Sequence, residues 1–518
     1  METTDLDAPL LHALAASSAN AGWHMPGHLS GRGFTDYFRQ MALQFDTTEL
    51  PSTDDINQPA GPALAAMQKA ADAFLAGVTR FITCGSTCAI HILLAAAAGR
   101  KGSLLIPRAS HQSVLYAASL LDLEVLFLES DTVRHTEEAY SGTADALPAS
   151  HAPAPYLFQP VSAVSVEQAL KKHPQCKTVL ITSPDYYGQC CDTALIARIC
   201  HQHNACLLVD EAHGAHFPFS KITRPYSAMA SGADACVQSG HKTLPVLTQG
   251  AYLHLSREGI ASGRISDERV AALIPVYQTS SPSFLIAASL DYARALMALK
   301  GESLISRQIS LLSTFIGKMS PRFSFSVKTI SPHQQASEAW HLENDPLRIV
   351  ITAGHHAKTL HAGTVKQRLA KTGTHIEFAD LTRLVLIPSL FHNESDWERL
   401  ADGFKNLFSA GSVTASRDRQ LSLLDAEHKW QQCLRVLPES VMKPGDALFR
   451  QHPCERKTLK RAEGLVSAQA LIPYPPGVPL VWPGEQIEKR HLDLIGQLLE
   501  NGISITGVQD GFVNAIKV

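Results

Sequence analysis

Short apolar runs alternate with helix-like stretches between residues 62 and 300, and no other feature constrains the fold of this chain as strongly. The runs are LEVLFLES (123–130), KTVLITSP (177–184), ACLLVDEAH (205–213), DACVQSGHK (234–242) and AYLHLS (251–256). Between two of them, residues 192–204 have the pattern of a helix. This order predicts a large domain with a doubly wound, mostly parallel sheet, in which the chemistry gathers at the carboxyl ends of the strands.

Two further parts of the chain adjoin this large domain. Residues 1–61 contain turn-forming residues without sustained periodicity, which predicts an N-terminal arm. Residues 301–415 predict a small α+β domain, because a helical stretch at 356–372 lies among four strand-like segments. Those segments are FSFSVKTI (323–330), PLRIVITAG (346–354), HIEFAD (375–380) and RLVLIPS (383–389).

The last part, residues 416–518, predicts a C-terminal domain. It begins with an amphipathic helix and contains PYPPGVPLVWPGE at 473–485. This stretch is too apolar and aromatic for a flexible linker, so we expect a rigid loop packed against the rest of the protein.

Charge and composition exclude several classes of protein. The chain has 45 basic and 48 acidic side chains, a net charge of −3, and 45% hydrophobic residues. A nucleic-acid binder would normally carry a basic excess, so the charge argues against this class of protein. We expect a globular enzyme instead. The charge-free stretch 81–99 is interrupted by polar residues, which favours a buried helix over a membrane span. A base-free N-terminus and 10 cysteines without a CxxC pair favour a cytoplasmic protein with reduced thiols.

The strongest chemical signal is a lysine and an aspartate at the ends of successive strands. Lys242 follows an apolar run, where burial would lower its pKa and suit its amine to imine formation. Asp210 ends the preceding run. Pyridoxal 5'-phosphate requires an acid at its ring nitrogen and a lysine at its aldehyde, so the pair predicts this cofactor. Taken singly, an exposed lysine and a helix-capping aspartate are the commoner roles.

Two further motifs would complete such a site. Gly85, Ser86 and Thr87 precede an apolar helical stretch, where helix amides and two hydroxyls would bind a phosphate. His111, in PRASHQS, would stack on the face of the cofactor ring. Each has a simpler interpretation by itself, because GST also suits a helix cap and a lone histidine is more often structural.

Histidines and acids also offer metal ligands. Asp210, His213 and His216 lie close in sequence, as do His201 and His203. With 24 histidines in the chain, such clusters arise by chance, and none has the spacing of a zinc motif. We therefore predict no metal.

Together these motifs resemble the ornithine/lysine/arginine decarboxylase family of fold-type-I enzymes, which depend on pyridoxal phosphate. The motifs are WHMPGH (23–28), FDTTEL…DDINQPAGP (45–62), GST (85–87), PRASHQS (107–113), TSPDYYGQCCD (182–192), VDEAHGAH (209–216), SGHKTLPVLTQG (239–250), TSSPSF (279–284), DPLRIVI (345–351) and YPPGVPLVWPGE (474–485). The resemblance covers nearly the whole chain, and SxHK at this distance from VDEAH is its most specific element. It implies an α/β fold with a doubly wound sheet, a smaller α+β domain and a C-terminal domain.

The resemblance also implies roles for individual residues. Lys242 would be the Schiff-base lysine, Asp210 the partner of the pyridinium and His111 the residue stacked on the ring, and we expect these three to be catalytic. Ser280 and Ser281 would approach the cofactor of a neighbouring subunit, which implies a homodimer or higher homo-oligomer. The other cofactor-binding residues would be Gly85, Ser86, Thr87, Ala212, His213, Ser239 and His241.

The chain departs from the larger members of the family. Its motifs start by residue 23, so we expect no response-regulator-like N-terminal wing and a likeness to the shorter members. Leu29 follows HMPGH where a lysine is expected. The absence of the wing favours a biosynthetic role, in polyamine formation, over acid resistance.

We expect the protein to decarboxylate arginine, lysine or ornithine to the corresponding amine and CO2. A second hypothesis is an aminotransferase or lyase on the same scaffold, because Arg348 and Arg383 offer partners for a substrate carboxylate. A non-catalytic or metal-dependent protein is the third. Acids on the arm are candidates for binding the substrate's distal cation, although turn and cap roles suit them equally well. They are Asp46, Glu49, Asp54 and Asp55.

Overall fold

A seven-stranded sheet forms the centre of the large domain in the computed structural model. The structure describes residues 21–129, 157–319, 323–325, 344–353, 362–409 and 417–517. The strand order is β2-β8-β7-β6-β5-β3-β4, and within this sheet only the pairs made by β8 are antiparallel. The strands are β2 (Val78–Ile82), β3 (Ser103–Pro107), β4 (Glu124–Leu128), β5 (Thr178–Thr182), β6 (Cys206–Asp210), β7 (Ala235–Gln238) and β8 (Ala251–Leu255). The predicted, mostly parallel sheet is confirmed.

Helices cover both faces of this sheet because successive side chains of a strand point to opposite sides. On β6, Leu208 belongs to the apolar core shared with α4 and α5, whereas Leu207 and Val209 belong to the core shared with α6 and α7. The helices of this domain are α3 (Pro62–Ala73), α4 (Gly85–Ala97), α5 (Gln112–Leu121), α6 (Ala163–Lys172), α7 (Thr193–Gln202), α8 (Gly240–Thr243), α9 (Arg257–Ala261) and α10 (Asp267–Tyr277). The helix expected at 192–204 is thus α7.

One long helix, α11 (Phe284–Met319), leads from the large domain into the small one. It runs through residue 300, where the sequence placed a boundary; the boundaries at 61, 300 and 415 stay predictions. The small domain has an antiparallel sheet of order β12-β13-β10-β9. Its elements are β9 (Phe323–Phe325), β10 (Ile349–Ala353), α12 (Ala362–Lys371), β12 (Phe378–Ala379), β13 (Leu384–Leu386) and α13 (Glu394–Ser409). Residues 326–330 and 354–361 of the predicted elements lie outside the described residues.

The N-terminal arm ties the small domain to the large one. Its strand β1 (Ala21–Trp23) pairs in parallel with β11 (Thr374–Ile376). The segment HIEFAD, expected to be one strand, is therefore divided: β11 joins the arm, β12 joins the small-domain sheet, and Glu377 lies between them. Further along the arm, the N–H of Gly27 donates to the carbonyl of His241 at 2.8 Å. The arm continues with α2 (Asp36–Met41) and the 3-10 helix η2 (Ala42–Phe45).

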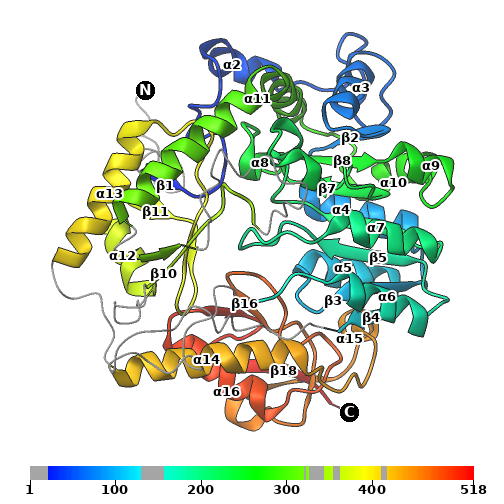
Figure 1. Cartoon of the computed structure of the whole chain (residues 1–518). Helices are drawn as coiled ribbons and strands as arrows, with labels where there is room; N and C mark the ends of the chain where they lie inside the picture. The colour runs from blue at the N-terminus through cyan, green and yellow to red at the C-terminus, as the bar shows by residue number, and fades with distance from the viewer. Residues whose placement is uncertain are drawn as a thin grey trace, which may run out of the picture.

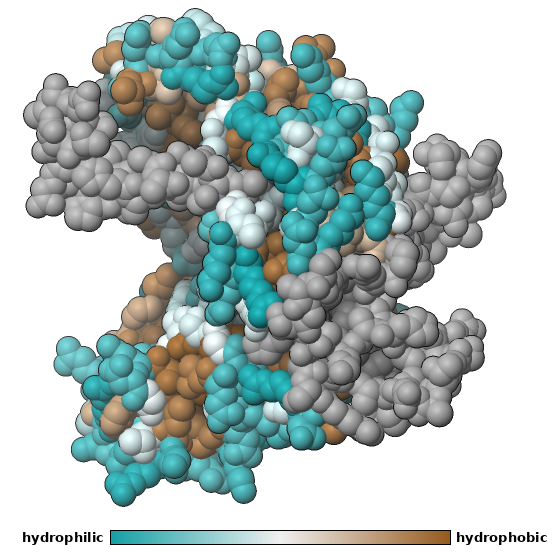
Figure 2. Space-filling model, turned by 90° about the vertical axis from the view of Figure 1, so that its left-hand side faces the viewer, coloured by the Kyte–Doolittle hydropathy of each residue, from teal (hydrophilic) through white to brown (hydrophobic). Residues whose placement is uncertain are grey.

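The C-terminal segment lies below both domains in Figure 1 and packs against them. Its core combines Trp430 and Leu494 with Tyr187 of the large domain and Phe378 of the small domain. Its elements are α14 (Arg417–Arg435), α15 (Pro444–Phe449), β14 (Cys454–Thr458), β15 (Val466–Ser467), β16 (Ile472–Tyr474), α16 (Lys489–Glu500), β17 (Ser504–Thr506) and β18 (Phe512–Ile516). Seen from the side of α12 and α13, apolar residues gather on this lower part of the surface (Figure 2).

Hydropathy gives no sign of a membrane span in the part of the chain that the structure describes. No helix there combines the length and the apolar character that crossing a bilayer requires. The charge-free stretch at 81–99 forms β2 and α4 of the large domain, as the interruption by polar residues predicted.

A buried ion-pair network joins the three parts of the molecule around Arg383. The Arg383 guanidinium donates to Asp380 at 3.0 Å and also pairs with Glu427 of α14. The hydroxyl of Tyr187, from the large domain, donates to Asp380 at 2.8 Å. All four side chains are buried. Charges taken out of water require such partners, so this network holds the three parts in one arrangement.

We expect Arg383→Met to lower the free energy of unfolding by about 3–5 kcal/mol, because it leaves two buried carboxylates without their cation. Denaturant unfolding followed by intrinsic fluorescence measures the loss. The matched control is Lys171→Met, which removes an exposed ion pair with Glu167 and should leave the unfolding midpoint nearly unchanged. Equal shifts of the two midpoints would contradict a stabilising role for Arg383.

Candidate active site

The amine of Lys242 lies just beyond the carboxyl end of β7, in the short helix α8. Its Nζ is 3.0 Å from Nε2 of His213. Burial lowers the pKa of Lys242 from 10.5 to about 8; the negative charge of Asp210 opposes this shift and the cation of Arg348 adds to it. The amine therefore loses its proton at a lower pH than an exposed lysine, which suits it to attack a carbonyl carbon.

Asp210 ends the neighbouring strand β6, which pairs in parallel with β7. The side chain is buried, and its Oδ1 accepts a hydrogen bond from the N–H of Ala212 at 3.2 Å. Among the described residues no donor reaches its Oδ2. Burial raises the pKa of Asp210, whereas the charge of Lys242 lowers it. A buried carboxylate with an open oxygen suits a cationic N–H group that the chain itself does not supply.

The GST motif opens α4 beside the turn that carries Lys242. Gly85 has a φ of 85°, a conformation that favours glycine, and it is the first residue of the helix. The hydroxyl of Ser239 donates to that of Ser86 at 2.7 Å. The N-cap residue, Cys84, makes no side-chain cap, so Ser86 and Thr87 are not helix caps and the first amides remain available to an anion.

His111 does cap a helix. Its Nδ1 accepts from the N–H of Ser113 at 3.2 Å, at the start of α5, so the structural role that the sequence left open for this histidine is present. Burial lowers its pKa to about 4, and the charge of Lys242 adds to this shift. A β-carbon at Gly477 would lie 3.6 Å from the imidazole, which shows how closely the C-terminal loop covers His111. The loop expected to be packed at 473–485 thus forms a wall beside this residue.

Three other predicted residues remain, of which His241 adjoins Lys242 and the two serines, Ser280 and Ser281, lie at the surface. His241 precedes Lys242, and its Nδ1 is 3.2 Å from the carbonyl of Gly250. Ser280 and Ser281 are exposed on the connection between α10 and α11. Because their expected contact is with a neighbouring subunit, it remains a prediction.

The histidines considered as metal ligands have other partners. His216 is 3.0 Å from Asp345, and His201 is 3.2 Å from Asp234. Across the described ranges, no group of three or more histidine, cysteine, aspartate or glutamate side chains is arranged to hold a metal ion.

The structure adds Glu377 and Tyr186, which sequence reasoning missed. The Tyr186 hydroxyl donates to Glu377 Oε1 at 2.9 Å, and the N–H of Met25 donates to Oε2 at 3.1 Å. The ring of Tyr186 meets that of His213 edge-on, with 4.9 Å between centroids. Glu377 acts on Lys242 electrostatically, because its charge raises the lysine pKa. The only signal in the sequence was a charged residue inside the strand-like HIEFAD.

Two family models match this chain in sequence. The Orn/Lys/Arg decarboxylase major domain matches residues 8–390, and the C-terminal domain of the same decarboxylases matches residues 427–507. The chain belongs to this family. Membership confirms the predicted family, and with it an enzyme that decarboxylates a basic amino acid.

Individual relatives agree with this assignment. An arginine decarboxylase of Bacillus subtilis is 29% identical over 97% of this chain and 95% of its own length. An arginine decarboxylase of Bacillus anthracis is 27% identical over 99% of this chain and 97% of its own. The solved lysine decarboxylase of Francisella novicida has a TM-score of 0.75 at 18% identity, covering 99% of this chain and 82% of that one. This last likeness shows the fold.

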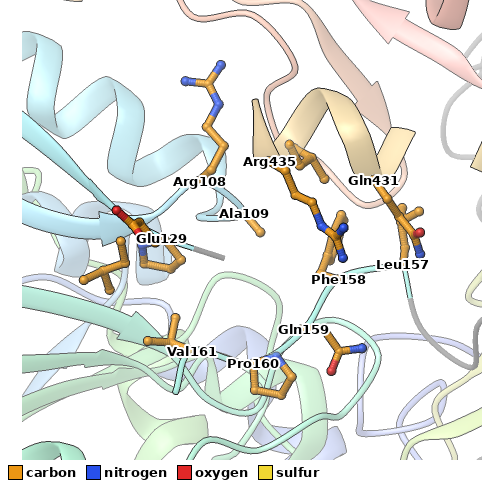
Figure 3. A pocket seen from close by; sticks show the side chains of 13 residues that line it. Arg108, Ala109, Glu129, Leu157, Phe158, Gln159, Pro160, Val161, Gln431 and Arg435 are labelled. Carbon is orange, nitrogen blue, oxygen red and sulfur yellow. The ribbon is translucent and has the colours of Figure 1, made fainter. Parts of the chain in front are cut away.

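A separate pocket lies between the large domain and α14. It is bounded by Arg108 and Ala109 before α5, by Phe158, and by Gln431 and Arg435 of α14 (Figure 3). None of the predicted site residues lines it. This pocket therefore does not bear on the prediction that the chemistry takes place at Lys242.

The lowered pKa of Lys242 predicts its reactivity. In the cofactor-free enzyme, acylation of Lys242 by an amine-directed reagent should be half-maximal near pH 8, because only the neutral amine reacts. Asp210→Asn should move this midpoint to lower pH, since it removes a charge that favours the ammonium. Mass spectrometry of the labelled peptide measures both. A midpoint near the ordinary 10.5 would contradict the buried environment.

Proposed function

We propose that this decarboxylase binds pyridoxal 5'-phosphate at Lys242 and releases CO2 from arginine, lysine or ornithine. The observation that carries the proposal is the pair of strand ends, where an amine with a lowered pKa and a buried carboxylate with an open oxygen lie on neighbouring strands. Arginine is the first substrate to test, since the two Bacillus relatives are named arginine decarboxylases.

The residues present fit this cofactor. Lys242 would hold its aldehyde carbon, and the open Oδ2 of Asp210 would accept the N–H of its ring. The hydroxyls of Ser86 and Ser239, already hydrogen-bonded to each other, would bind its phosphate together with the amides of α4. When bound, the cofactor supplies an electron sink for the charge left at the α-carbon by departing CO2. The further predicted contacts are those of Gly85, Thr87, His111, Ala212, His213 and His241.

The chain's own residues would control the proton and the water around that reaction. Lys242 can take up or give a proton at Nζ because its pKa lies near neutral pH. The C-terminal loop closes over His111, where Gln112 donates its N–H to the carbonyl of Gly477 at 3.3 Å. If this loop excludes water from the site, the charge of Asp210 acts more strongly there.

Glu377 is the acid that we propose for the distal cation of the substrate. Its charge raises the pKa of Lys242, so the two side chains lie near each other. Its carboxylate accepts hydrogen bonds from the hydroxyl of Tyr186 and the backbone N–H of Met25, which fix its orientation. The arm acids suit this role less well. Asp54 accepts from the backbone N–H groups of its own loop, among them Gly61 at 2.6 Å, and Asp55 accepts from that of Asn57 at 2.7 Å. Asp46 and Glu49 are exposed.

The aminotransferase hypothesis loses one of its two arginines. Arg383 is occupied by Asp380 and Glu427 inside the molecule, so it has no open face for a substrate carboxylate. Arg348 donates to His213 from one nitrogen and keeps two nitrogens without a hydrogen-bond partner, so it remains the arginine on which this hypothesis rests. No observation favours transamination over decarboxylation.

We also propose that the enzyme works as a homo-oligomer in the cytoplasm and serves polyamine formation. Exposed Ser280 and Ser281 are then free to approach a second copy, and Leu43 on the arm exposes 86% of its surface. All 10 cysteines are free of disulfides and most are buried, which suits a reducing compartment.

Purified enzyme supplied with pyridoxal phosphate should release CO2 and the matching amine from arginine, lysine or ornithine. The test adds each amino acid separately and measures both products. Lys242→Ala should abolish release and the visible absorbance of the bound cofactor, because it removes the attachment point. A visible absorbance without CO2 from any of the three would contradict the proposed reaction while leaving the cofactor in place.

Glu377→Gln should lower kcat/KM for the preferred substrate by roughly 10- to 100-fold, which corresponds to the about 1.5–3 kcal/mol of a hydrogen bond to a charged group. The loss should fall mainly on KM. Norleucine, which lacks the distal cation, should be turned over equally by both proteins. Asp46→Asn is the matched control on the arm. A loss in Asp46→Asn but not in Glu377→Gln would move the cation site to the arm.

A further inference from the structure

Arg348 is buried beside the candidate site with most of its donors unused. It precedes β10, is 1% exposed, and its Nη2 donates to Nδ1 of His213 at 2.8 Å. Its Nε and Nη1 are buried without a hydrogen-bond partner. The turn at Gly188 packs on its side chain so closely that a β-carbon there would lie 2.4 Å from the Arg348 β-carbon. The base of the side chain is therefore tightly packed, and the guanidinium donates to one histidine nitrogen.

This contact decides which nitrogen of His213 carries the proton. A guanidinium has only donors, so Nδ1 must accept with its lone pair. A neutral imidazole has one N–H, which then lies on Nε2. His213 is buried, and this burial holds its pKa well below 6.5, with the cation of Arg348 acting in the same direction. The ring is thus neutral, with its single proton on the side facing Lys242.

The same logic extends to Lys242. Its Nζ lies 3.0 Å from the Nε2 that carries the proton. A hydrogen bond between them requires Nζ to be the acceptor, and an ammonium group has no lone pair to offer. Arg348, His213 and Lys242 therefore form a chain in which every donor points toward the amine.

We propose that Arg348 is a positioning residue that, through His213, favours the neutral form of the free Lys242 amine. This inference rests on the proposed function, in which Lys242 is free whenever the substrate has taken its place on the cofactor. A neutral amine can then accept a proton or attack again, whereas an ammonium can do neither.

Other groups act on the same two residues from every side. Those that face His213 or Lys242 are Asp210 on β6, Glu377 between β11 and β12, Tyr186 after β5, His111 at α5 and His241 on α8. The two carboxylates favour the ammonium form of Lys242, and Arg348 disfavours it. Removing the cation leaves the carboxylates unopposed, so the lysine pKa should rise.

Three substitutions separate the donor of Arg348 from its charge. Arg348→Lys keeps both, Arg348→Gln keeps a donor without charge, and Arg348→Met keeps neither. We expect kcat to stay close to wild type in Arg348→Lys and to fall by at least about tenfold in Arg348→Met, as for other residues that fix a histidine tautomer. The loss in Arg348→Gln should be smaller than in Arg348→Met. The acid limb of the kcat–pH profile should move to higher pH in the methionine variant.

A readout that needs no turnover accompanies the kinetics. In the cofactor-free full chain, the pH midpoint of Lys242 acylation should rise by about one unit or more in Arg348→Met, as expected for the loss of a nearby charge. A wild-type midpoint in that variant would overturn the proposal, as would equal losses of kcat in all three. If Arg348→Met does not fold, two variants of His213 replace it. The amide of His213→Gln can accept from Arg348 and donate to Lys242, so this variant should retain more activity than His213→Leu. Equal activities of the two variants would overturn the proposal.

The two proposals fail differently. Absence of CO2 from wild-type enzyme with all three amino acids contradicts the proposed function, and the acylation midpoints still decide the role of Arg348. Release of CO2 by wild type with an unshifted midpoint in Arg348→Met contradicts only the role of Arg348.

Discussion

The parallel pairing of β6 with β7 is the constraint on which the site depends. Two strands that run in the same direction end at the same edge of a sheet, so the residues that follow them are neighbours in space although they are far apart in sequence. Asp210 ends one strand and Lys242 follows the other by one short helical turn. Their separation is thus set by backbone hydrogen bonds rather than by flexible side chains, and the low dielectric of the buried edge makes their charges felt.

Everything else at the site is brought to that edge from other parts of the chain. The arm contributes the N–H of Met25 and a backbone contact between Gly27 and His241. The small domain contributes Glu377 and Arg348, and the C-terminal segment contributes the loop around Gly477. The Arg383 network keeps these parts in one arrangement, because its charges are stable in the interior only while all partners are present. Stability and site geometry are therefore coupled in this molecule.

Much of the fold was predictable because strands buried on both faces are marked by continuous apolar runs. The runs around 177–184, 205–213 and 251–256 correspond to β5, β6 and β8. The segment HIEFAD was harder, since its division between two sheets depends on the arm, which pairs with β11 through backbone groups that carry no sequence signal. Of the site, Lys242, Asp210 and the GST motif were predictable because each adjoins a strand or a helix start. Glu377 and Tyr186 were not, because tertiary packing alone brings them together.

By itself, the sequence determined the class of fold and the family, since these follow from local apolar periodicity and from motifs of contiguous residues. It also predicted which residues carry the central chemistry. Only the tertiary structure decided how those residues are surrounded. In the structure Arg383 forms ion pairs with internal acids, whereas Arg348 donates a hydrogen bond to His213. In the sequence both arginines lie in strand-like segments and looked equivalent. The physical reason is that burial and partner choice, which set the charge state of a side chain, arise from contacts between distant segments and are not encoded in any local pattern.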